Sequence, residues 1–136
     1  MINLLPRLRI VGSSLIVLSF AHIYFAKHLE WKKDAALLTP VNRKIFHVHV
    51  FFICLILVMM GSLCLFAPRT LLTPTPLARL ILIGLVIFWA TRLLFQWLVY
   101  DSSHWRGHTL NTVAHIAFTF LWTYYTLVFA AALSAQ

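Results

Sequence analysis

The sequence predicts an all-α fold, a bundle of four transmembrane helices. Of its 136 residues, 62% are apolar and only 10% are charged, whereas a soluble domain carries about 25% charged residues. The apolar residues fall in four runs, each long enough to cross a bilayer as a helix. The helices are expected at residues 8–27, 44–67, 76–100 and 108–133. A chain of this length leaves no room for a second domain, so residues 1–136 are expected to form a single integral membrane domain.

The first span follows a short basic tail that contains Arg7 and Arg9. A secretory signal peptide also has a basic start and an apolar middle, but His22 and the lack of a small-x-small cleavage site favour a retained helix. Gly12, Ser19, His22 and Ala26 form a stripe of small and polar residues at near-heptad spacing. Because small residues let helices approach closely in lipid, this stripe predicts a contact with another helix.

Threonine–proline pairs predict helix starts at or ahead of the second and third apolar runs. Thr39-Pro40 and Thr75-Pro76 each combine a hydroxyl that can cap a helix with a proline suited to its first turn. The second span is expected to end at Pro68.

Within the second span, His47, Cys54 and Gly61 recur every seven residues and predict an inward face. His49 lies about 200° around the helix from His47, so the two rings cannot hold one ion together. Cys54 and Cys64 are about 15 Å apart along a helix, which is too far for a disulfide.

The third span contains an arginine, which costs about 2.5–3.5 kcal/mol at the centre of a membrane helix. Trp89, Arg92, Gln96 and Tyr100 are spaced so that one helix face holds all four. We expect that face to contact protein, a cavity or a ligand. The fourth span carries a polar stripe of its own, formed by His108, Asn111, His115, Thr119, Trp122 and Thr126.

The net charge of +8 lies mainly beside the apolar runs. This placement indicates contacts with anionic lipid headgroups and argues against nucleic acid as a partner. With four spans, six lysines and arginines flank the membrane on one side (Lys27, Lys32, Lys33, Arg43, Lys44 and Arg106) and four on the other (Arg7, Arg9, Arg69 and Arg79). The excess predicts that both termini lie outside the cytoplasm.

Polar residues of all four spans are expected at a similar depth. His22 lies near the end of the first span, His47 near the start of the second, Arg92 in the last third of the third, and His115 two turns into the fourth. These helix ends meet at the same side of the membrane, so the side chains share one half of the bilayer.

Two cofactors would use this arrangement. Haem b needs two facing imidazoles as iron ligands, and His22 or His47 opposite His115 is the candidate pair, with Arg92 beside a propionate. A quinone needs donors for its carbonyl oxygens and aromatic walls. Its candidate residues are Arg92, Gln96, Tyr100, Trp89 and one of the histidines.

The alternative is that these residues have only a structural role. Arg92 would then extend to the membrane–water interface or pair with Tyr100 and Asp101. The histidines would only make hydrogen bonds between helices. In that case the protein is a non-catalytic accessory or anchor subunit, bound to a membrane protein partner or to further copies of itself.

Three segments carry a resemblance to a known family. They are Leu29-x-Trp31, the stretch from Arg43 to Phe51, and Phe88-Trp89-x-x-Arg92-x-x-x-Gln96-x-x-x-Tyr100. Residues 29–131 resemble small bacterial four-span membrane proteins with no assigned function. The resemblance implies the architecture and the bacterial inner membrane, and it assigns no activity. The histidine spacing does not match that of cytochrome b families.

Overall fold

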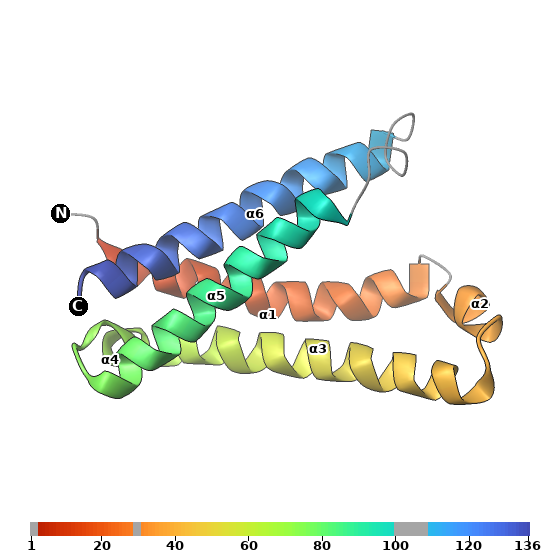
Figure 1. Cartoon of the computed structure of the whole chain (residues 1–136), viewed down its shortest axis with the longest axis horizontal. Helices are drawn as coiled ribbons and strands as arrows, with labels where there is room; N and C mark the ends of the chain where they lie inside the picture. Colours follow the sequence, from red (N-terminus) through yellow and green to blue (C-terminus); the bar gives the residue numbers. More distant parts are fainter. Residues whose placement is uncertain (1–2, 29–30, 100–108) are drawn as a thin grey trace. The chain divides into compact units, whose positions relative to one another are not determined.

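The computed structural model describes residues 3–28, 31–99 and 109–136, and their side chains except those of residues 25–32 and 109–111. Figure 1 shows that this part of the chain is entirely helical apart from its turns. The helices are α1 (Leu4–His28), α2 (Trp31–Ala36), α3 (Pro40–Phe66), α4 (Pro68–Leu72), α5 (Pro76–Leu98) and α6 (Thr109–Ser134). The predicted all-α fold class is therefore confirmed, with helix ends within four residues of those expected.

Both threonine–proline pairs begin helices as predicted. Thr39 Oγ1 accepts a hydrogen bond from the backbone N–H of Asn42 at 3.4 Å, and the proline that follows Thr39 opens α3. Thr75 Oγ1 accepts one from Ala78 N at 3.2 Å at the start of α5. These bonds satisfy backbone donors that the first turn of a helix leaves without a partner.

The short helices α2 and α4 lie in segments where the sequence predicts only loops. Each has six residues or fewer, which is too short for apolar periodicity to reveal it. Gln136 fixes the turn after α4, because its Nε2 donates to Leu71 O at 2.7 Å and to Thr73 O at 3.3 Å.

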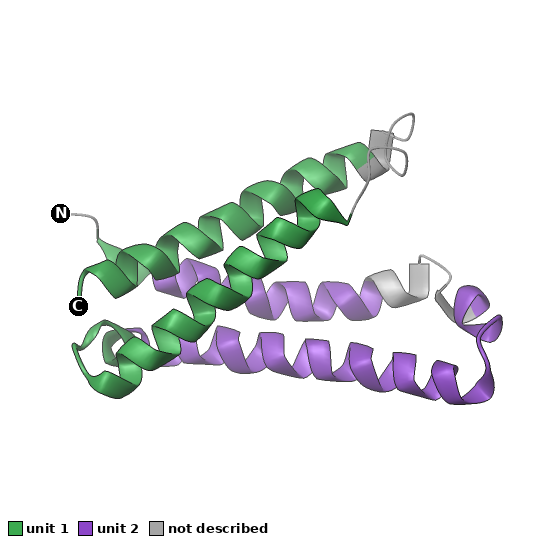
Figure 2. Cartoon of the chain, in the orientation of Figure 1, with its two compact units in different colours: residues 1–7, 69–136 green, residues 8–68 purple. Residues whose placement is uncertain are grey.

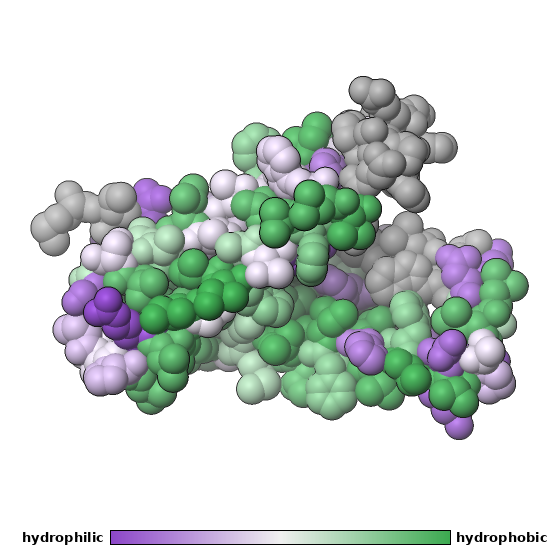
Figure 3. Space-filling model, viewed as in Figure 1, coloured by the Kyte–Doolittle hydropathy of each residue, from purple (hydrophilic) through white to green (hydrophobic). Residues whose placement is uncertain are grey.

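Four of the described helices are long and apolar enough to cross a membrane: Leu4–Tyr24, Pro40–Phe66, Pro76–Leu98 and Thr112–Ser134. Large apolar side chains remain exposed along them, among them Phe20, Phe51, Trp97 and Phe120. In Figure 3 hydrophobic residues cover much of the visible face of the long helices, and the most hydrophilic residues lie mainly toward the helix ends. Lipid is the solvent that such surfaces require, so the chain is a multi-pass membrane protein.

The chain divides into two compact units, coloured separately in Figure 2. Unit 2 comprises residues 8–68 and contains most of α1 together with α2 and α3. Unit 1 comprises residues 1–7 and 69–136 and contains α4, α5 and α6.

Within unit 2, α1 and α3 touch backbone to backbone at a pair of glycines. A Cβ atom built on Gly12 would lie 2.7 Å from Gly61 O, and one built on Gly61 would lie 2.8 Å from Gly12 O. Seven residues further along α1 and seven back along α3, Ser19 Oγ donates to Cys54 O at 3.0 Å, and the Cys54 thiol donates to Ser19 O at 3.7 Å. The predicted small-residue stripe of α1 therefore faces the predicted inward face of α3 at Cys54 and Gly61.

Within unit 1, α5 and α6 pack together over much of their length. Trp89 of α5 meets Trp122 of α6, and Gln96 meets His115, so the helices are antiparallel and keep a constant register. Phe129 continues the buried core toward the other end of the pair.

Candidate functional site

The predicted polar face of α5 lies against α6. Trp89 and Gln96 are buried, with exposed fractions of 1% and 4%, and Arg92 is half-buried between them. The three residues occupy one helix face because they are three and four residues apart. Tyr100, the fourth predicted member of this face, lies outside the described residues.

Gln96 is the centre of a hydrogen-bond network between the two helices. Its Oε1 accepts from Arg92 Nη1 at 3.2 Å and from Trp122 Nε1 at 3.4 Å. Its Nε2 lies 3.0 Å from Nδ1 of His115. The predicted association of Arg92, Gln96 and His115 from two different spans is thus present in unit 1.

The network fixes which nitrogen of His115 accepts a hydrogen bond. The guanidinium of Arg92 and the indole N–H of Trp122 can only donate, so the amide oxygen of Gln96 must face them. The amide NH₂ then faces His115 and needs a lone pair on Nδ1. A neutral His115 ring in this arrangement carries its proton on Nε2, which is therefore a donor.

Aromatic rings form the wall beside this network. The ring of Trp122 stacks on Trp89 with centroids 5.1 Å apart and on Phe118 with centroids 5.4 Å apart. Tyr125 meets Trp89 edge-on at 4.8 Å. The guanidinium carbon of Arg92 lies 5.1 Å from the Trp122 ring centroid, within the range of a cation–π interaction.

Trp89 presents a buried donor. Its Nε1 is inaccessible to solvent and has no hydrogen-bond partner within the described part of the chain. An unsatisfied buried donor costs about 1–3 kcal/mol, and native structures contain few of them.

The other two predicted histidines belong to unit 2, so their predicted meeting with His115 stays a prediction. His22 is half-buried, and its Nδ1 lies 2.9 Å from the carbonyl oxygen of Leu18 on its own helix. Since a carbonyl can only accept, Nδ1 carries the proton and a neutral His22 has its lone pair on Nε2. His47 is exposed and its ring lies edge-on to Phe46 at 5.7 Å.

No group of three or more His, Cys, Asp or Glu side chains that could hold a metal ion occurs among residues 3–28, 31–99 and 109–136. The haem-ligand arrangement that the sequence predicts, a pair of imidazoles from different units, stays a prediction.

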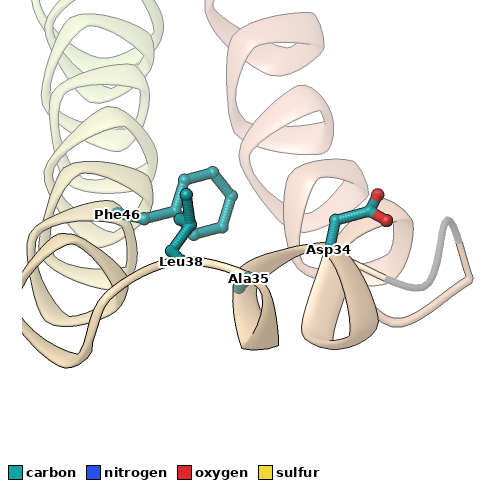
Figure 4. A pocket seen from close by; sticks show the side chains of 4 residues that line it. All are labelled: Asp34, Ala35, Leu38 and Phe46. Atoms are coloured by element: carbon teal, nitrogen blue, oxygen red, sulfur yellow. The ribbon is translucent and has the colours of Figure 1, made fainter.

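A pocket between α2 and α3 in unit 2 is separate from this network. It is lined by Asp34, Ala35, Leu38 and Phe46. In Figure 4, Leu38 and Phe46 lie close together, while the carboxylate of Asp34 lies on the far side of Ala35. The pocket thus combines a small apolar wall with one exposed acidic side chain.

Sequence reasoning missed the role of Trp122, which it assigned to a polar stripe, and it did not single out Phe118 or Tyr125. The available signal was heptad spacing: Trp122 follows His115 by seven residues, as Tyr125 follows Phe118.

Comparisons of the chain with protein-family models, curated proteins and solved structures find no match.

Proposed function

We propose that the α5–α6 pair binds the headgroup of a quinone within the membrane and so takes part in electron transfer. The observation that carries this proposal is the hydrogen-bonded network of Arg92, Gln96 and His115 beside the stacked indoles of Trp89 and Trp122. An oxidised quinone has a flat ring, two carbonyl acceptors and no donor. Its chemistry is complementary to N–H donors set against aromatic rings.

Each residue has a distinct role in this proposal. In this proposal the guanidinium of Arg92 and Nε2–H of His115 donate to one quinone oxygen. Gln96 holds both in place through its amide, because its oxygen accepts from Arg92 and its NH₂ donates to His115. Trp122 supports the guanidinium through its ring face.

The proton position on His115 favours a quinone over haem b at this site. A histidine that ligates iron through Nε2 donates Nδ1–H to an acceptor. Nδ1 of His115 instead faces the amide NH₂ of Gln96, which is a donor. His22 has the proton arrangement of a ligand, because its Nδ1–H donates to Leu18 O. A haem would therefore be expected to involve His22 before His115.

The test is the quinone content of protein purified in a mild detergent. We expect organic extraction to release about one quinone per chain, and the visible spectrum to lack a haem Soret band. His115→Phe should lose the quinone. His49→Phe is the matched control, since His49 is an exposed histidine of α3 whose ring bonds its own helix at Ile45 O. Wild-type protein that carries no quinone and binds no added quinone would overturn the proposal.

A second candidate is a non-catalytic accessory or anchor subunit. The observation that favours it is that all three polar contacts of the buried Gln96 amide are made inside the α5–α6 pair. In this candidate function the network has a purely structural role, which is to hold two helices together. This candidate predicts co-purification with a membrane protein partner at fixed stoichiometry, or with further copies of the chain. A monodisperse monomer that binds quinone would exclude it.

We place the protein in a bacterial inner membrane with both termini outside the cytoplasm. The excess of lysine and arginine in the two loops between the first and second and between the third and fourth spans supports this orientation. These loops would lie in the cytoplasm and contact anionic headgroups. A reporter that is active only in the cytoplasm, fused after Gln136, should be inactive, and an active fusion would reverse the orientation.

A further inference from the structure

We infer that the indole N–H of Trp89 is a second anchoring donor of the quinone site and that it binds the carbonyl oxygen distant from His115. The inference rests on the proposed function, and it assigns a ligand contact to a donor that finds no acceptor among the residues the structure describes. It makes the site asymmetric, with a different kind of donor for each of the two quinone oxygens.

The side chain of Trp89 is buried, with an exposed fraction of 1%, and its Nε1 donor lacks an acceptor in the described part of the chain. The neighbouring Trp122 has the same chemistry and is also buried, yet its N–H donates to Gln96 Oε1 at 3.4 Å. The same oxygen of Gln96 accepts hydrogen bonds from Trp122 and from Arg92. It accepts none from Trp89, so the network does not satisfy the Trp89 donor.

Trp89 lies next to the polar network of Arg92 and Gln96 on α5. Trp89 precedes Arg92 by three residues on the same face of α5, so it lies about 4.5 Å further along the helix axis. Its ring is nearly parallel to that of Trp122, at an interplanar angle of 24°. The indole of Trp89 is therefore continuous with the aromatic wall that lines the polar network.

The Trp89 indole and its surroundings restrict the chemistry of the group that could accept its hydrogen bond. An indole can only donate, so its partner must be an acceptor. The surroundings of Trp89 are aromatic, with Trp122 stacked on it, Tyr125 edge-on at 4.8 Å and Phe88 at 5.2 Å. A carbonyl oxygen on a flat apolar ring meets both requirements.

The two quinone oxygens would then face different donors. One would face N–H groups of His115 and Arg92, and the other would face the neutral indole N–H of Trp89.

The experiment compares quinone binding by full-length wild-type protein and Trp89→Phe, measured calorimetrically with decyl-ubiquinone in detergent. Phenylalanine keeps an aromatic ring at this position and removes only the N–H and part of the ring area. We expect roughly tenfold weaker binding, equivalent to about 1.4 kcal/mol. The matched control is Trp97→Phe, because Trp97 is on the same helix but 70% exposed, and this variant should bind as the wild type does.

A second variant separates loss of the donor from loss of packing. Benzothienylalanine in place of Trp89 preserves the shape of the indole and lacks the N–H, so it should weaken binding to a similar extent. With carbonyl-labelled quinone, infrared spectra should show one of the two carbonyl bands moving to higher frequency in this variant while the other stays.

The outcomes are distinct. If the wild type binds quinone and both Trp89 variants bind equally well, with both carbonyl bands unchanged, this inference is wrong, and the N–H serves a buried water or no partner. If the wild type binds no quinone, the proposed function itself fails.

Discussion

Replacing Gly12 by alanine should separate α1 from α3. A Cβ at this position would lie 2.7 Å from Gly61 O, 2.8 Å from Leu65 N and 3.1 Å from Cys64 C. All three are backbone atoms of α3, so no side-chain rotation can relieve the overlap. The helices must move apart until these contacts reach ordinary van der Waals distances.

The expected loss of stability follows from three contributions. Overpacking of a close contact costs about 1–3 kcal/mol. Separation of the helices also weakens the reciprocal bonds between Ser19 and Cys54, each of which contributes about 0.6 kcal/mol if typical of membrane helices. Alanine is a better helix former than glycine by up to about 1 kcal/mol, which offsets part of the loss. The free energy of unfolding should therefore fall by about 2 kcal/mol.

The two cysteines supply a local assay. Cys64 is fully buried and Cys54 is half-buried, and both belong to the surface of α3 that faces α1. A maleimide dye that fluoresces on reaction with thiols will report when this contact opens during heating. Gly84→Ala is the control, because a Cβ there meets nothing within 4 Å, and it should not lower the transition temperature. A Gly12→Ala protein as stable as the wild type would refute the glycine contact.

Three further changes test other parts of the structure. Gln96→Glu replaces the amide NH₂ that faces His115 by an acceptor, so ¹⁵N resonances of the ring should move from the Nε2–H to the Nδ1–H form; an unchanged tautomer would contradict the network. Ser19→Ala should cost only about 0.6 kcal/mol, the average for a hydrogen bond between membrane helices, and a loss above 2 kcal/mol would mean that the bond to Cys54 is not its main role. Thr75→Ala removes the cap of α5 and should cost about 1 kcal/mol in thermal or detergent unfolding, whereas no change would show that the cap is replaced by solvent.

Composition and proline placement were sufficient to predict the fold class. Four apolar runs of helix-spanning length predict four helices in lipid, because a helix satisfies its backbone hydrogen bonds within one segment. The Thr75–Pro76 pair located a helix start to the residue, since capping depends on neighbours in sequence. The five-residue helix α4 was missed because its stability comes from contacts such as Gln136 with Leu71, which are distant in sequence.

The candidate site was predicted in part. Spacing alone placed Arg92 and Gln96 on one face of α5, and membrane topology placed His115 at a similar depth. The partner of each group could not be predicted, because the register between α5 and α6 depends on packing of rings such as Trp89 on Trp122. The sequence therefore indicated that polar side chains lie at a similar depth in the membrane, but it did not indicate which ring nitrogen of His115 carries the proton.

Equilibrium binding of a short-tailed quinone to the wild type and to Gln96→Leu tests the central claim most directly. The account predicts one saturable site per chain in the wild type and at least tenfold weaker binding in the variant, because leucine can orient neither Arg92 nor His115. Equal binding by both proteins, or no saturable binding by the wild type, would contradict it.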